Sequence, residues 1–173
     1  MSTPARTGFA ALDAPEIFFE DFSVGRSWER DGPELTEQSI TGFAAQYDPQ
    51  YFHMDATAAE RSMFGGLIAS GWQTVGITMR LICEAYLLRA ASLGSPGIDQ
   101  LRWLKPVRPG DRLRMKMTVV EARPSKSKPD RGSVLHLWEA YNQNGELVLS
   151  MQGWGMFLRR NPPPPDTATE TRA

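Results

Sequence analysis

The sequence has little cysteine, little histidine and almost no net charge. Cys83 is the only cysteine among 173 residues, which excludes an intramolecular disulfide and a zinc site built from several cysteines. A reducing compartment is the natural setting for such a chain. The 19 lysines and arginines nearly balance the 20 aspartates and glutamates, so the net charge of −1 gives no indication of nucleic-acid binding.

Long apolar runs are also missing. The longest uncharged stretch, Ser62–Met79, contains four glycines together with serine, glutamine and threonine, and it is therefore too polar for a membrane span. Met1–Ala11 lacks the apolar core of a signal peptide. The sequence therefore predicts a cytoplasmic protein with no membrane or nucleic-acid partner.

The charges that are present are unevenly distributed. Residues 1–60 contain three arginines and eleven acidic residues, whereas residues 101–131 contain ten basic residues and three acidic ones. The basic second half could bind an anionic ligand. A solvated strand face would produce the same pattern, and both interpretations remain open.

Composition divides the chain into three parts. Residues 1–15 show no sustained apolar period, and residues 161–173 carry four consecutive prolines followed by small polar residues. Both ends have too little apolar surface to offset the entropy lost on ordering. We expect a flexible N-terminal segment at 1–15, one folded domain at 16–160 and a disordered proline-rich tail at 161–173.

Helices are expected in the first half of the domain. Thr36 can cap a helix that Asp48-Pro49 ends, and Asp55 can cap a short second helix over residues 56–62. A long helix is expected from Gly71 to about Ala91. Because it is apolar on nearly all sides, it belongs in the interior.

Strands are expected in the second half, where the apolar period changes to two. Residues 113–119 alternate between apolar and polar, residues 134–141 and 146–158 flank a turn at 142–145, and further strands are expected at 101–107 and near 26–35. Together these elements predict an α+β fold in which a curved antiparallel sheet wraps around the long central helix.

Asp48 and His53 are the first candidate catalytic residues. The chain has only two histidines, and this one stands five residues after an aspartate in the break between two helices. Histidine exchanges protons near neutral pH, and a neighbouring carboxylate can orient it, so the pair could hold one water between them. The alternative is structural: Asp48 caps a turn and His53 is a satisfied, partly buried imidazole.

Ser70 and Gly71 add a possible oxyanion site. Ser70 is a good N-cap residue, which makes Gly71 the first residue of the long helix. The leading N–H groups of a helix have no internal partner, and a glycine there lets a ligand approach the backbone closely. These features suit the oxygen of a thioester carbonyl that becomes an enolate. Simple capping and packing is the alternative.

Other residues are weaker candidates. Tyr51, Phe52 and Trp72 could contact a substrate, although packing would explain them equally well and Trp72, like Trp103, is most simply a core residue. Basic residues of one loop could bind the phosphates of an anionic ligand, unless they are only solvated: Arg123, Lys126, Lys128 and Arg131. His136 alternates with Val134 and Trp138 in a strand and is interpreted as a core or interface histidine.

Taken together, residues 17–158 resemble the MaoC-like dehydratases and (R)-specific enoyl-CoA hydratases of the hot-dog fold. Asp48, His53, Asp55 and Gly71 match the order and approximate spacing of that family's hallmark, and residues 101–111 resemble its strand leading into a Pro-Val-x-Pro-Gly-Asp turn. Two features depart from the pattern. Proline stands at position 49, followed by Gln50-Tyr51, and Ser70 replaces the histidine that usually precedes the glycine.

The resemblance implies an activity and an assembly. It implies a lyase that adds water to a trans-2-enoyl-CoA or removes it from an (R)-3-hydroxyacyl-CoA. Asp48 and His53 would activate the water, the Gly71 N–H would stabilise the enolate, and no metal or cofactor would be needed beyond the coenzyme A of the substrate. A homodimer or higher homo-oligomer is also implied. A hot-dog acyl-CoA thioesterase and a non-catalytic acyl-thioester binding module remain alternatives.

Overall fold

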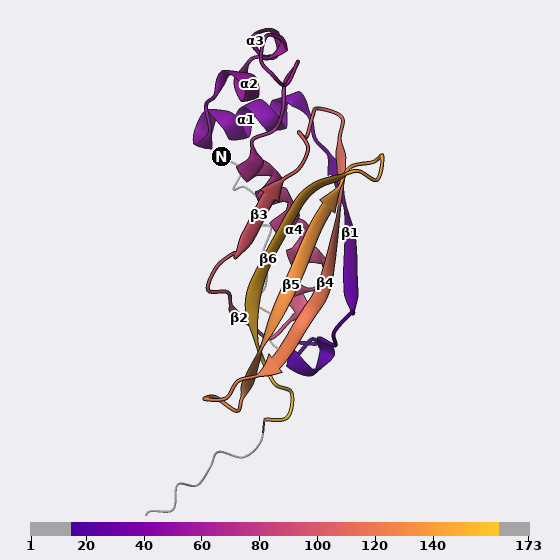
Figure 1. Ribbon diagram of the computed structural model, residues 1–173, viewed down its shortest axis with the longest axis vertical. Coiled ribbons are helices and arrows are strands. Elements are labelled where there is room, and N and C mark those ends of the chain that lie inside the picture. The colour runs from indigo at the N-terminus through magenta and orange to yellow at the C-terminus, as the bar shows by residue number, and fades with distance from the viewer. Residues whose placement is uncertain (1–14, 163–173) are drawn as a thin grey trace, which may run out of the picture.

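A computed structural model describes residues 15–162 and contains the antiparallel sheet that the alternating sequence predicts. Its strands are β1 (Ser27–Glu34), β2 (Ser92–Gly94), β3 (Gln100–Trp103), β4 (Arg112–Pro124), β5 (Arg131–Tyr141) and β6 (Leu147–Leu158). The order is β1-β4-β5-β6, and both β2 and β3 pair with the outer side of β6. The long hairpins place β4, β5 and β6 in the middle of the sheet (Figure 1).

The helices occupy one face and one end of this sheet. They are α1 (Glu37–Tyr47), α2 (Tyr51–Met54), α3 (Ala56–Glu60) and α4 (Gly71–Ala85), with short 3-10 turns at Phe19–Asp21 and Leu87–Arg89. Figure 1 shows α4 lying along the sheet, while α1, α2 and α3 lie together beyond the N-terminal end of α4. This arrangement is the predicted hot-dog fold, with the sheet curved around a central helix.

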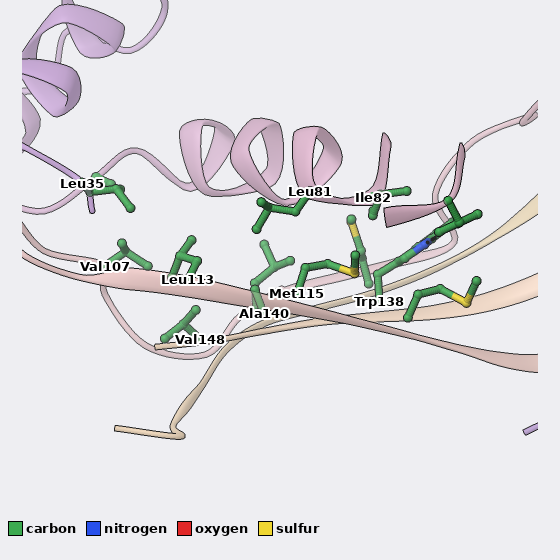
Figure 2. Packing of buried hydrophobic residues seen from close by; sticks show 14 of the residues in the cluster. Leu35, Leu81, Ile82, Val107, Leu113, Met115, Trp138, Ala140 and Val148 are labelled. Carbon is green, nitrogen blue, oxygen red and sulfur yellow. Dashed lines mark hydrogen bonds between the residues drawn. The ribbon is translucent and has the colours of Figure 1, made fainter. Parts of the chain in front are cut away.

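The core lies between α4 and the sheet (Figure 2). Leu81 and Ile82 of α4 and Leu113 and Met115 of β4 are each at most 2% exposed. From Leu113 to Val119 every second residue of β4 points to this side, as period-two alternation requires. Truncating one such side chain to alanine typically costs about 2–5 kcal/mol, so this contact fixes the position of α4 on the sheet.

The expected helix caps are present. The Thr36 hydroxyl accepts a hydrogen bond from the Ser39 N–H at 3.1 Å, and the Asp55 carboxylate accepts one from the Ala58 N–H at 2.9 Å. Ser70 likewise accepts from the Trp72 N–H at 3.2 Å. The starts of α1, α3 and α4 were therefore predicted correctly from local sequence.

Some expected boundaries were wrong. The long helix ends at Ala85 rather than near Ala91, because Tyr86 leaves the helical conformation and a 3-10 turn follows. The helix also has an exposed side, with Trp72 60% and Met79 42% exposed, so it is not enclosed on all sides. The strand expected over residues 101–107 is β3 alone, which ends at Trp103.

The predictions for the two ends concern residues 1–14 and 163–173, which lie outside the described part of the chain. Among residues 15–162, no helix combines the length and apolar character needed to cross a membrane.

Candidate active site

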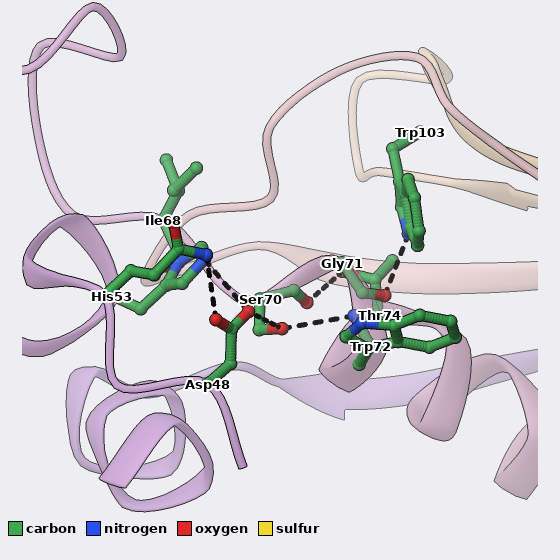
Figure 3. A network of polar contacts seen from close by, with 9 residues as sticks. Asp48, His53, Ile68, Ser70, Gly71, Trp72, Thr74 and Trp103 are labelled. Carbon is green, nitrogen blue, oxygen red and sulfur yellow. Dashed lines mark hydrogen bonds and ion pairs between the residues drawn. The ribbon is translucent and has the colours of Figure 1, made fainter.

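Asp48 and His53 meet where α1 ends and α2 begins. Asp48 is the C-terminal cap of α1, Pro49 follows, and His53 lies in the single turn of α2. The five-residue interval is therefore partly helical and not the open turn that the sequence suggested. It brings His53 Nε2 to 3.4 Å from Asp48 Oδ2, with His53 only 4% exposed (Figure 3).

The orientation of His53 is fixed from its other side. His53 Nδ1 lies 2.8 Å from the Ile68 carbonyl oxygen, which can only accept a hydrogen bond. In the neutral ring this contact places the proton on Nδ1 and leaves Nε2 with a free lone pair. Asp48 and His53 Nε2 then both act as acceptors, and one water can donate a hydrogen bond to each of them.

Two further side chains hold the Asp48 carboxylate. The Ser70 hydroxyl donates to Oδ2 at 2.6 Å, and the Gln50 amide donates to Oδ1 at 2.8 Å. The Ser70 hydrogen bond is the main cause that lowers the pKa of Asp48. Gln50 and the nearby His53 add to the lowering, and partial burial opposes it. Asp48 is thus kept ionised in the site.

The start of α4 lies beside this pair. The Ser70 hydroxyl caps the Trp72 N–H, and the Gly71 N–H at the first position of the helix has no hydrogen-bond acceptor among residues 15–162. The Trp103 indole N–H donates to the Gly71 carbonyl at 2.9 Å, and a Cβ at position 71 would lie 2.5 Å from the Trp103 ring. Only glycine therefore fits between α4 and this ring.

These groups open into one cavity of about 440 Å³. The predicted residues that line it are Asp48, Phe52, His53, Gly71 and Trp72, while Ser70 is fully buried behind them. Tyr51 does not line the cavity and is 53% exposed. The sequence prediction of a substrate contact at Tyr51 is therefore not supported by its position.

Ten of the 15 lining residues were not selected as site residues from sequence, among them Gln50, Lys105 and Trp103. Gln50 and Lys105 both line the cavity, and Trp103, interpreted as a core residue, is 48% exposed at its rim. The ammonium of Lys105 pairs with Glu146. The position of Gln50 between Asp48 and His53 in the sequence could have identified it as a site residue. Trp103 reaches Gly71 only through tertiary folding, so no local pattern could have identified it.

The basic loop lies elsewhere. Lys126 and Lys128 belong to the turn between β4 and β5, and Arg131 is the first residue of β5, at the end of the sheet opposite α1–α3 (Figure 1). The Arg131 guanidinium is also paired with Asp130 at 2.8 Å. The fold of this chain therefore does not bring the predicted phosphate-binding residues to the cavity. No cluster of His, Cys, Asp and Glu within residues 15–162 has the arrangement of a metal site.

Comparison with known families agrees with this geometry. A model of the MaoC like domain matches residues 21–136, which include the whole site from Asp48 to Trp103. The chain belongs to the MaoC-like domain family.

Solved structures share the fold of this MaoC-like domain. A MaoC-like dehydratase from Rhodospirillum rubrum is 40% identical with a TM-score of 0.78, covering 84% of this chain and 99% of that one. The (R)-hydratase PhaJ1 from Pseudomonas aeruginosa is 25% identical with a TM-score of 0.67, covering 85% and 94%. Among curated relatives, mesaconyl-CoA hydratase from Cereibacter sphaeroides is 40% identical over 43% of this chain, but the match spans only 22% of that protein.

Proposed function

We propose that this MaoC-like domain is a hydro-lyase that interconverts a trans-2-enoyl-CoA and an (R)-3-hydroxyacyl-CoA. The observation that carries the proposal is the convergence of Asp48, His53 and the Gly71 N–H on one cavity. The names of an (R)-hydratase and a mesaconyl-CoA hydratase among similar proteins support the same reaction class.

In the hydration direction, one water donates hydrogen bonds to Asp48 and to His53 Nε2, so its oxygen is presented to C3 of the enoyl group. As the C–O bond forms, the water loses a proton to this pair. Electron density moves to the thioester oxygen, where the Gly71 N–H and the positive end of the α4 dipole stabilise it. The pair then delivers that proton to C2, which completes the addition and restores the original protonation state of the pair. The reaction requires no cofactor besides the coenzyme A carried by the substrate.

The direct test is hydration of crotonyl-CoA and dec-2-enoyl-CoA, followed as loss of the enoyl absorbance. Asp48→Asn and His53→Ala should each lower kcat by at least about 100-fold, the usual contribution of a general acid or base. Asp130→Asn is a matched control, because it alters a carboxylate at the opposite end of the sheet. Full activity in both site variants would refute the assignment of the pair.

A thiol reagent in the same assay separates the alternatives. Release of free coenzyme A with the double bond intact would identify a thioesterase instead. Binding of the thioester without either reaction would identify a non-catalytic module.

We also propose that the protein forms a homodimer through the sheet edge formed by β3. Within the described chain β3 pairs with β6 alone. Trp72, Trp103 and Leu104 beside it are 60%, 48% and 50% exposed. An unpaired edge with exposed apolar side chains favours pairing with a second copy. Light scattering during size-exclusion chromatography should give a dimer mass, lowered by Leu104→Glu but not by Val24→Glu, a control on the 68% exposed Val24.

A further inference from the structure

A second cavity, which we call the distal cavity, lies at the other end of α4. It has a volume of about 350 Å³ and lies between the last turns of α4, the segment 92–98 and strands β5 and β6. It shares no lining residue with the cavity that holds Asp48 and His53. Its volume falls within the range of about 300–1,000 Å³ that is usual for small-molecule sites.

The lining of the distal cavity is mainly apolar and aromatic, and its polar side chains are Ser92, Ser95, Tyr86 and His136. Its walls include Met79, Ile82, Tyr86, Trp138, Phe157 and the ring of His136. Such a surface excludes charged ligands, because burying a charge without a partner is strongly unfavourable. It accepts an apolar chain or ring.

Among the polar side chains of this lining, His136 differs in having no hydrogen-bond partner within residues 15–162. It is 1% exposed, and neither of its ring nitrogens makes a hydrogen bond of acceptable geometry within the described chain. Burial lowers the pKa of His136 to about 4, an effect that the nearby Gly153 backbone opposes only in part. The ring is therefore neutral near pH 7 and offers one donor and one acceptor.

The surroundings hold that ring in place. Its plane stacks on Trp138, with centroids 4.9 Å apart and an angle of 15°. The Trp138 indole N–H donates to the Tyr86 hydroxyl at 3.1 Å, and that hydroxyl keeps its own proton as a donor. Buried polar groups in native proteins are nearly always paired, so an oriented imidazole at a cavity wall with no hydrogen-bond partner among residues 15–162 is suited to pair with a group that enters the cavity.

We propose that the distal cavity binds a neutral apolar group that carries one hydroxyl, which hydrogen-bonds to His136. Two sources could supply this chemistry. Gly71, Val75 and Met79 follow one face of α4 at intervals of four residues, and Met79 lies about 12 Å along the axis from Gly71. The far end of an acyl chain held at Gly71 is therefore one source, and a separate small molecule is the other.

The cavity is tested first without any reaction. Because His53 and His136 are the only histidines, ¹⁵N labelling of histidine gives two sets of ring signals, which His136→Phe assigns. The probes are p-cresol and toluene, which differ by one hydroxyl. We expect p-cresol to shift the His136 signals with an affinity about three- to tenfold higher than that of toluene, the worth of one hydrogen bond.

His136→Phe supplies the matched control for the hydrogen bond. In His136→Phe the aromatic stacking is kept and the hydrogen bond is removed, so p-cresol and toluene should bind equally, as followed by tryptophan fluorescence. Equal affinities of the two probes in the wild type, or shifts of His53 alone, would overturn the proposal. That comparison uses the unaltered protein and does not depend on the folding of any variant.

A second assay distinguishes the two sources and rests on the proposed hydratase function. If the acyl chain enters the distal cavity, 10-hydroxydec-2-enoyl-CoA should have a KM about three- to tenfold below that of dec-2-enoyl-CoA, and His136→Phe should abolish the difference. Equal KM values together with tighter p-cresol binding would assign the cavity to a separate molecule. Failure to hydrate either thioester would count against the proposed function and leave the binding result valid.

Discussion

Replacing Ser70 with alanine removes two contacts of one hydroxyl. It deletes the 2.6 Å hydrogen bond to Asp48 Oδ2 and the 3.2 Å cap of the Trp72 N–H. A hydrogen bond to a charged group contributes about 1.5–3 kcal/mol, and an N-cap contributes about 1 kcal/mol. Ser70→Ala should therefore lower the free energy of unfolding at pH 7 by about 2–4 kcal/mol, measured by urea denaturation.

Thr36→Ala is the matched control for capping alone. The Thr36 hydroxyl caps the Ser39 N–H at 3.1 Å at the start of α1 and touches no carboxylate. Thr36→Ala should lower the free energy of unfolding by only about 1 kcal/mol. Equal losses in the two variants would mean that the hydrogen bond between Ser70 and Asp48 contributes nothing measurable.

The pH dependence follows from the lowered pKa of Asp48. Since this pKa lies below its ordinary value of 3.8 in the native state, the ionised carboxylate stabilises the protein above that pH. The stabilisation is lost as pH falls through the native pKa. The stability difference between wild type and Ser70→Ala should thus be full at pH 7 and shrink below about pH 4.

Activity gives an independent readout of the same contact. If ionised Asp48 is the required base, kcat falls on the acid side as Asp48 is protonated. Ser70→Ala raises the pKa of Asp48, so this fall should occur at a higher pH than in the wild type. An unchanged acid limb in a folded, active variant would refute the role assigned to the Ser70 hydroxyl.

Three further changes give distinct outcomes. Gly71→Ala places a Cβ 2.5 Å from the Trp103 ring and should reduce kcat and Tm, with partial recovery of Tm when Trp103→Ala is added. As pH falls from 6.5 to about 4, the wild type should lose about 3 kcal/mol of unfolding free energy through His136, because buried His136 stays neutral while the unfolded chain binds a proton. In His136→Phe this part of the pH dependence should be absent. Arg108→Met removes the 2.5 Å hydrogen bond to the Phe64 carbonyl and should speed amide exchange in residues 64–66.

Local sequence was sufficient to predict the parts of the site that depend on neighbouring residues. The caps Thr36, Asp55 and Ser70 act within three residues of themselves, and the alternation in β4 directly encodes which side faces α4. The proximity of Asp48 and His53 also needed only the chain break at Pro49. These features therefore follow from short-range geometry.

Long-range features could not be predicted in the same way. Trp103 covers Gly71 because β3 pairs with the edge of β6, a contact that no local pattern specifies. The end of α4 was missed because apolar residues continue past Ala85, although the chain there turns toward β2. The basic turn after β4 was a candidate for phosphate binding because of its charge, with a solvated loop as the alternative, but the direction of the hairpin carries it to the opposite end of the sheet.

The two departures from the family pattern meet at a single carboxylate. Gln50 donates to one Asp48 oxygen and Ser70 to the other, although the two residues are 20 positions apart. Both hydrogen bonds favour the ionised form, so the departures act in the same direction on the Asp48 pKa. A carboxylate held from both sides has less freedom to follow a moving substrate but needs little reorganisation when it binds water. Gln50 and Ser70 therefore set the orientation and basicity of Asp48, whereas Gly71 and the Nδ1 atom of His53 are held by the separate contacts with Trp103 and Ile68.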